Sequence, residues 1–94
     1  MENQKLINNE DAQRFELKSE GQTAFIEYQQ TDATTIMLTH TKVPAELEGR
    51  GVGKKLVELT LHHLRDHNLK ADPKCAFVSV YLKRHPEWES IVVQ

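Results

Sequence analysis

The sequence predicts a single α+β domain with a mixed, largely antiparallel sheet, and three observations lead to this prediction. Alternation typical of strands fills the first half of the chain, a helical period begins near residue 51, and a glycine-rich loop joins the two halves. A chain of 94 residues without repeats or linkers is enough for one domain. We therefore expect a flexible N-terminal lead-in over residues 1–12 and one domain over residues 13–94.

Three antiparallel strands are expected in the first half of the chain. Residues 15–18 alternate apolar and charged side chains and end at a turn containing Gly21. Residues 23–29 alternate again, and a polar turn then leads to a dense run of β-branched and apolar residues over 34–42. The short connections favour an antiparallel meander.

An amphipathic helix is expected over residues 51–67. At about 100° per residue, its apolar side and its small residues lie within one arc. The members of this arc are Gly53, Leu56, Val57, Thr60, Leu61 and Leu64.

In the last third of the chain, the sequence predicts a short strand over residues 69–72 and then a second helix, although Val78, Val80 and Leu82 also alternate as in a strand. Asp72-Pro73 indicates the start of that helix, with Asp as N-cap and Pro as first helical residue. His85-Pro86 indicates its end, because proline disfavours helical geometry in the residue before it. The apolar residues 91–93 could add a last strand.

Composition and charge exclude several classes of protein. Hydrophobic residues make up 38% and charged residues 28% of the chain, which is typical of a folded protein. A formal net charge of −2 argues against nucleic acid or an anionic membrane as partner. No stretch is apolar enough to span a bilayer, and the polar N-terminus predicts no signal peptide. Since Cys75 is the only cysteine, no internal disulfide is possible, and we expect a cytoplasmic protein.

The segment 43–55, VPAELEGRGVGKK, carries the strongest functional signal. Its alternating glycines let the backbone approach a ligand closely and turn N–H groups toward it. The helix N-terminus behind them adds free N–H donors and the positive end of the helix dipole, and Lys54 and Lys55 add charge. The segment therefore predicts a phosphate-binding loop rather than a turn that only joins strand to helix.

Two common phosphate-binding motifs do not fit this loop. A P-loop needs four residues between its glycines and then Lys-Ser/Thr. Here three residues separate Gly49 from Gly53, and Lys55 stands where the hydroxyl should be. A dinucleotide fingerprint needs two residues between its second and third glycines, whereas Val52 alone separates Gly51 from Gly53.

The order of elements and the loop resemble the GNAT superfamily of acyl-CoA N-acyltransferases over residues 14–93. The pyrophosphate loop of that family, Gln/Arg-x-x-Gly-x-Gly/Ala, matches residues 48–53, with Glu48 in the Gln/Arg position. The short length and the ending from Cys75 to Trp88 resemble the minimal YjdJ-type branch. The resemblance implies a GNAT-like sheet with a long cofactor-binding helix and a short C-terminal helix.

The resemblance also implies an acetyl-CoA-dependent N-acetyltransferase, and it indicates which residues hold coenzyme A. The pantetheine arm would pair with the backbone of residues 40–43, in a cleft where two strands splay apart. The pyrophosphate would bind N–H groups of residues 49–54. The expected cofactor-binding residues are Thr41, Val43, Glu48, Gly49, Arg50, Gly51, Val52, Gly53, Lys54, Lys55 and Arg84.

Three side chains are candidates for catalytic roles. The resemblance implies that Tyr81 protonates the leaving thiolate, although it could be only a core tyrosine. His40, near the end of its strand, could serve as a base or be a half-exposed strand residue. Cys75 is predicted in the first helical turn, where dipole and N–H groups favour a thiolate that could carry the acetyl group. Alternatively, Cys75 packs as a small apolar side chain beneath the helix.

The sequence also bears on metal binding, on the acetyl acceptor and on the oligomeric state. His63 and His67 have a spacing that can share one zinc ion, but no third ligand is evident apart from the neighbouring His62 or Asp66. A solvated helix face explains these residues better, so we expect no metal. The acceptor is expected to be an amine, either a small molecule or a protein lysine or N-terminus, and the chain a monomer or weak dimer. The rival hypothesis is a noncatalytic CoA-binding or interaction module.

Overall fold

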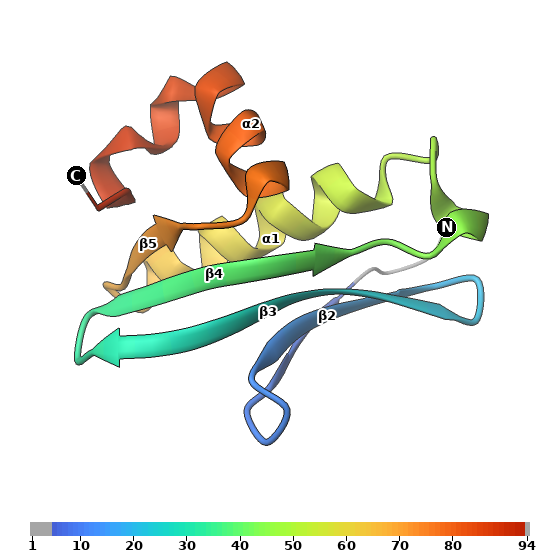
Figure 1. The fold of residues 1–94 in the computed structure, drawn as a ribbon, viewed down its shortest axis with the longest axis horizontal. Helices are drawn as coiled ribbons and strands as arrows, with labels where there is room; N and C mark the ends of the chain where they lie inside the picture. The colour runs from blue at the N-terminus through green and yellow to red at the C-terminus, as the bar shows by residue number, and fades with distance from the viewer. Residues whose placement is uncertain (1–4, 94) are drawn as a thin grey trace.

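A five-stranded sheet in the order β1-β2-β3-β4-β5 forms the base of the computed structural model, which describes residues 5–93 (Figure 1). Strands β1 to β4 pair with one another in antiparallel order, and β5 pairs with β4 in parallel. The fold class predicted from the sequence is therefore confirmed. The strands are β1 (Leu6–Asn9), β2 (Arg14–Ser19), β3 (Gln22–Asp32), β4 (Thr35–Lys42) and β5 (Lys70–Pro73).

Strand β1 corrects the expectation of a lead-in over residues 1–12. Residues 6–9 pair with β2, and Leu6 packs against the core. The tyrosine hydroxyl of Tyr28 also donates a hydrogen bond to Asn8 Oδ1 at 2.7 Å. A strand of four residues with a single inward apolar side chain has too little periodicity to be recognised from sequence. Residues 1–4 of the expected lead-in lie outside the described residues.

A β-bulge in β4 decides which side chains face the helices. Glu27 is opposite His40 while Tyr28 is opposite Leu38, so Thr39 is an extra residue in the pairing. Because side chains alternate along a strand, the bulge puts Leu38 and Thr41 on the same face of the sheet. His40 consequently lies on the opposite face.

Helix α1 (Val52–Asp66) covers one face of the sheet and confirms the predicted helix. Every member of the predicted arc is buried, whereas Leu59, outside the arc, is half-buried. Each fully buried leucine contributes about 1.5–3 kcal/mol to stability. Thr60 Oγ1 is also buried, and among the described residues it has no hydrogen-bond partner.

The start of the second helix differs from the prediction. Asp72 and Pro73 belong to β5, and α2 (Ala76–Arg84) begins only after Cys75. The N–H groups of Lys74 and Cys75 both donate to Leu38 O, at 3.0 and 2.9 Å. This pairing with β4 keeps the chain extended past Asp72-Pro73, so tertiary contact outweighs the local preference for a helix start.

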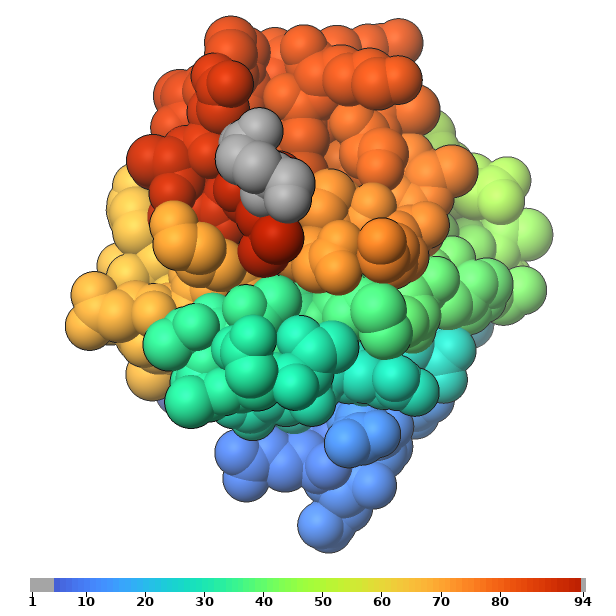
Figure 2. Space-filling model, turned by 60° about the vertical axis from the view of Figure 1, so that its left-hand side comes forward, coloured from blue at the N-terminus to red at the C-terminus, as the bar shows by residue number. Residues whose placement is uncertain are grey.

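The end of the chain follows the prediction only in part. Helix α2 ends at Arg84, before His85-Pro86, as expected. A 3-10 helix, η2 (Pro86–Ile91), then buries Trp88, and the predicted strand over residues 91–93 is reduced to a single parallel bridge between Ala71 and Val92. The space-filling view shows this C-terminal part gathered at one end of the molecule and the N-terminal strands at the other (Figure 2). None of the helices described is both long and apolar enough to cross a membrane.

Candidate functional site

Strands β4 and β5 part after Leu38. Their pairing runs from Thr35 opposite Lys70 to Leu38 opposite Pro73. Beyond that point, residues 40–42 pair only with β3 among the described strands. One edge of the end of β4 therefore presents backbone groups that can pair with an extended ligand.

The glycine loop follows β4 and leads into α1. A short 3-10 helix, η1 (Ala45–Leu47), anchors it through the buried side chain of Leu47. Gly49 and Gly51 have φ values of +79° and +76°, in the left-handed region that favours glycine. Gly51 is the N-cap of α1, and α1 has no side-chain cap hydrogen bond. Its first N–H groups are therefore available to an anion.

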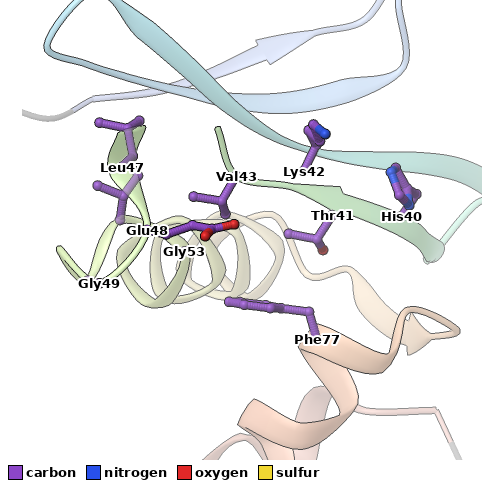
Figure 3. Close-up of a pocket in the computed structure, with 11 residues that line it drawn as sticks. His40, Thr41, Lys42, Val43, Leu47, Glu48, Gly49, Gly53 and Phe77 are labelled. Atoms are coloured by element: carbon purple, nitrogen blue, oxygen red, sulfur yellow. The ribbon is translucent and has the colours of Figure 1, made fainter. Parts of the chain in front are cut away.

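A cavity of about 670 Å³ lies between these two features and α2 (Figure 3). We call it the loop cavity. In Figure 3, Thr41 and Val43 point from β4 toward α1 and Phe77, while His40 and Lys42 point the other way. The residues that line the loop cavity are His40, Thr41, Lys42, Val43, Leu47, Glu48, Gly49, Gly51, Val52, Gly53 and Phe77.

Phe77 of α2 bounds the loop cavity, and the sequence does not single it out as a site residue. Its side chain is 45% exposed. A Cβ placed on Gly53 would lie only 2.6 Å from Phe77 Cζ, so the absence of a side chain at Gly53 permits this approach. The signal that could have pointed to Phe77 is a large apolar residue at an exposed position of a helix.

A second cavity of about 650 Å³ lies on the other side of Phe77, and we call it the helix cavity. It contains Tyr81 and two of the predicted cofactor-binding residues, Lys54 and Arg84. The residues that line it are Lys54, Ala76, Phe77, Val80, Tyr81, Arg84 and His85. Since Phe77 lines both, the two cavities are neighbours.

Two further predicted cofactor-binding residues line neither cavity. Arg50 Nη1 lies 2.5 Å from Glu20 Oε2 in the β2–β3 turn, and both side chains are about half exposed. Lys55 is exposed in the first turn of α1. The carboxylate of Glu48, by contrast, lies in the loop cavity, where its negative charge opposes an anionic ligand.

Cys75 does not itself line the loop cavity, but it contacts Thr41, which does. Its Sγ lies 3.1 Å from Thr41 Oγ1, and either atom can donate the hydrogen bond. The prediction that Cys75 lies in the first turn of the helix is wrong. Cys75 is instead the N-cap of α2 and has an extended backbone. Its carbonyl accepts a hydrogen bond from Ser79 N. The side chain is 9% exposed.

Tyr81 and His40 are not brought together with Cys75. Tyr81 lines the helix cavity, and its ring stacks on His85 with centroids 4.1 Å apart. Burial raises the pKa of Tyr81, and the negative charge of Glu58 adds to the rise. The phenol therefore keeps its proton at neutral pH and can donate it. His40 lies on the face of β4 away from Thr41, and its side chain is exposed.

The helical histidines contact each other. The rings of His63 and His67 have centroids 4.1 Å apart, and His67 Nδ1 is 2.8 Å from His63 O. Burial lowers the pKa of His63, and the neighbouring His67 lowers it further. Within residues 5–93, no further His, Cys, Asp or Glu side chain completes a group that could hold a metal ion.

Two strands that part beside a glycine loop, with a helix beginning directly after the loop, are the features of an N-acyltransferase fold. Comparison with known protein families identifies the family. The family model of the GCN5-related N-acetyltransferases matches residues 14–91. The chain therefore belongs to this family.

Individual relatives agree with this assignment. The chain is 32% identical to protein NATD1 of Xenopus tropicalis over 63 residues, which are 67% of this chain and 58% of that protein. Protein NATD1 of Homo sapiens is also 32% identical over 63 residues, which are 56% of its length. The chain thus spans less than two thirds of these curated relatives. The NMR solution structure of a GCN5-like candidate N-acetyltransferase from Staphylococcus aureus matches with a TM-score of 0.73 and 32% identity, covering 99% of this chain and 91% of that one.

Proposed function

We propose that this protein is an acetyl-CoA-dependent N-acetyltransferase that transfers an acetyl group to an amine. The observation that carries the proposal is that the open edge of β4 and the uncapped start of α1 meet at one cavity. Family membership supports the acyltransferase class. Acetyl-CoA as the donor, an amine as the acceptor, the YjdJ-type branch and a cytoplasmic location are parts of this proposal.

The residues of the loop cavity fit coenzyme A, with one exception. Amide groups of a pantetheine arm can pair with the open edge of residues 40–43 as a neighbouring strand would. Phosphates can accept hydrogen bonds from N–H groups of residues 49–54 other than Arg50, whose N–H donates to Leu47 O at 3.3 Å. A Cβ placed on Gly49 or Gly51 would meet nothing within 4 Å, which leaves room for a ligand. The exception is the carboxylate of Glu48.

Bound acetyl-CoA supplies a thioester whose carbonyl carbon accepts a nucleophile. Tyr81, protonated at neutral pH, is proposed to supply the proton for the leaving thiolate. Cys75 is proposed to lie at the thioester end of the cavity, because it contacts Thr41 where β4 and β5 part. Two routes follow from this placement: direct transfer to the amine, and transfer through an acetyl group on Cys75.

The second candidate function is a noncatalytic CoA-binding module. The observation that favours it is the separation of the candidate catalytic groups. Tyr81 lines the helix cavity and His40 lies on the opposite face of β4, so among the described residues neither forms a hydrogen bond with Cys75. Such a module would retain the glycine loop and lack turnover.

Calorimetric titration with acetyl-CoA, followed by a free-thiol assay with a panel of amines, tests both candidates. The enzyme hypothesis predicts saturable binding and thiol release that requires an amine. Binding without release on any amine favours the module. Absence of binding at millimolar acetyl-CoA contradicts both functions.

A further inference from the structure

Trp88 lies at the centre of the contact between the C-terminal segment and the two helices. It belongs to η2, is only 6% exposed, and is the single tryptophan of the chain. The ring of His62 meets the indole in a T-shaped arrangement with centroids 4.8 Å apart, and Arg65 Cζ lies 5.0 Å from the centroid of the indole ring. Both partners belong to α1, over which the C-terminal segment lies (Figure 1). These contacts hold the indole in one orientation.

Tyr81 of α2 completes this cluster. Its side chain forms a hydrogen bond with the side chain of Trp88. Because an indole N–H can only donate, the phenol oxygen is the acceptor. The ring of Tyr81 stacks on His85 with centroids 4.1 Å apart, and Trp88 N donates to His85 O at 3.2 Å, which closes the turn between α2 and η2. The phenol is therefore fixed at its ring and at its oxygen.

The direction of this hydrogen bond matters for proton donation. A phenol that accepts keeps its own O–H proton free, whereas a phenol that donates, as Tyr28 does to Asn8 Oδ1, has its proton engaged. A donor at the oxygen also stabilises the phenolate that remains once the proton has left. Burial is the largest influence on the pKa of Tyr81 and raises it, and the hydrogen bond with Trp88 opposes that rise.

We propose that Trp88 is a positioning residue for acetyl transfer, whose indole N–H holds the phenol oxygen of Tyr81 while the phenol proton stays free for the leaving thiolate. This proposal rests on the proposed function, in which Tyr81 supplies that proton. The amine nitrogen bonds to the carbonyl carbon, the bond from carbon to sulfur breaks, and the proton passes from Tyr81 Oη to the sulfur. The phenolate then regains a proton from solvent, to which the acetylated nitrogen releases one. Trp88 lines neither cavity, so it acts through Tyr81.

The single indole N–H signal in the NMR spectrum tests the hydrogen bond without a measurement of activity. Tyr81→Phe removes the acceptor, so we expect the indole hydrogen to exchange with water roughly tenfold faster. Tyr28→Phe is the matched control and should leave the signal unchanged, since Tyr28 lies on β3 and has Asn8 as its partner. An indole signal and an exchange rate that Tyr81→Phe does not alter would overturn the proposal.

The pKa of Tyr81 gives a second readout. In a Tyr28→Phe background Tyr81 is the only tyrosine, so an absorbance titration reports its ionisation alone. Trp88→Phe keeps an aromatic ring against His62 and Arg65 but has no N–H to donate. It should therefore raise the pKa of Tyr81 and move the alkaline limb of kcat to higher pH.

The charges around Tyr81 are the same with and without the indole, so they do not account for such a change. The charged and titratable groups that face Tyr81 are Lys54, Glu58, Arg84, His85 and Glu87. Ile91→Val is the matched control for packing, because Ile91 is a buried residue of the same 3-10 helix and lines neither cavity. It should leave the pKa of Tyr81 unchanged.

A double-mutant cycle tests whether Trp88 acts through Tyr81. We expect Trp88→Phe to lower kcat by roughly tenfold with little change in the KM of acetyl-CoA, and to have no further effect in a Tyr81→Phe background. Circular dichroism confirms that each variant is folded. Equal losses in the two backgrounds, or an unchanged pKa of Tyr81 in Trp88→Phe, would mean that Trp88 only packs, and the proposed function would still stand. Absence of turnover by the wild-type protein with every amine would instead contradict the proposed function and the role of Trp88 together.

Discussion

Thr41 Oγ1 and Cys75 Sγ lie 3.1 Å apart, across the point where β4 and β5 separate. The contact depends on the bulge at Thr39, which turns Thr41 toward the helices. It also depends on Leu38 O, which holds Cys75 N at 2.9 Å before α2 begins. The cysteine is thereby held against Thr41, a residue that lines the loop cavity.

Replacement of Cys75 by alanine tests whether this thiol takes part in transfer. We expect Cys75→Ala to lower kcat by at least about tenfold, as loss of a participating group does, with little change in acetyl-CoA affinity. Thr41→Val, which removes the hydroxyl partner, should have a smaller effect of the same sign. Steady-state kinetics and calorimetry measure the two quantities. Turnover of Cys75→Ala at the parent rate would show that the thiol only packs.

Mass spectrometry distinguishes the two routes of transfer. After incubation with acetyl-CoA and no amine, a covalent route predicts one added acetyl group on Cys75, which a competent amine then removes. Direct transfer predicts an unmodified chain under the same conditions. Cys75→Ala is the control for acetylation elsewhere.

A side chain at Gly51 should obstruct the anion site. Because Gly51 has φ of +76°, a β-branched residue such as valine would be strained there, so asparagine, which tolerates this region, is the better probe. We expect Gly51→Asn to weaken coenzyme A binding by roughly tenfold or more, equivalent to about 1.4 kcal/mol. Gly21→Asn is the matched control, since Gly21 also has φ of +76° but lies in the β2–β3 turn. Equal affinities for the two variants would contradict the placement of the pyrophosphate.

Removal of the negative charge at Glu48 should strengthen cofactor binding. Glu48 faces the loop cavity, and a like charge near a phosphate costs about 1 kcal/mol when solvent is close. Glu48→Gln is therefore expected to lower the Kd for coenzyme A by roughly fivefold. Glu46→Gln is the control, because Glu46 is exposed on η1 outside the cavity. A weaker complex with Glu48→Gln would mean that the carboxylate binds the ligand through a hydrogen bond.

The sequence was informative where local pattern decides structure. The helical period alone identifies the buried face of α1, because side chains three and four residues apart meet the sheet together. The glycine spacing likewise locates the loop, since positive φ at Gly49 and Gly51 is a local property.

Other features depend on contacts between distant segments and could not be predicted. The side on which His40 lies follows from the bulge opposite Glu27, which is a property of strand pairing. Helix α2 begins late because Leu38 O accepts two N–H groups, although Asp72-Pro73 favours an earlier start. The role of Phe77 in both cavities follows from its approach to Gly53, which is equally invisible to local pattern.

Thr60 offers a test of the fold that leaves the site untouched. Its buried hydroxyl has no partner among the described residues, and an unpaired buried hydroxyl costs about 1–3 kcal/mol. Thr60→Val removes the hydroxyl and keeps the side-chain shape, so we expect the free energy of unfolding to rise by about 1 kcal/mol. Thr60→Ser keeps the hydroxyl and loses a methyl group, and it should lower that free energy. Urea unfolding measures both, and a less stable Thr60→Val would show that the hydroxyl is satisfied.

The proton-donor role proposed for Tyr81 predicts a particular pH profile. Burial and Glu58 raise the pKa of Tyr81 above the ordinary tyrosine value near 10, so the neutral phenol persists across the physiological range. If Tyr81 protonates the leaving thiolate, the alkaline limb of the kcat profile should lie above about pH 10, where the phenol loses its proton. Tyr81→Phe should lower kcat by roughly a hundredfold and abolish that alkaline limb.

Tyr28→Phe is the matched control for Tyr81→Phe. Tyr28 is also buried, and burial likewise raises its pKa, but it lies on β3 and donates to Asn8 rather than lining either cavity. Its replacement should cost about 1 kcal/mol of stability through the lost hydrogen bond and leave the pH profile of kcat unchanged. If Tyr81→Phe keeps both the rate and the alkaline limb of the parent, another group supplies the proton, and Tyr81 serves only to pack against His85.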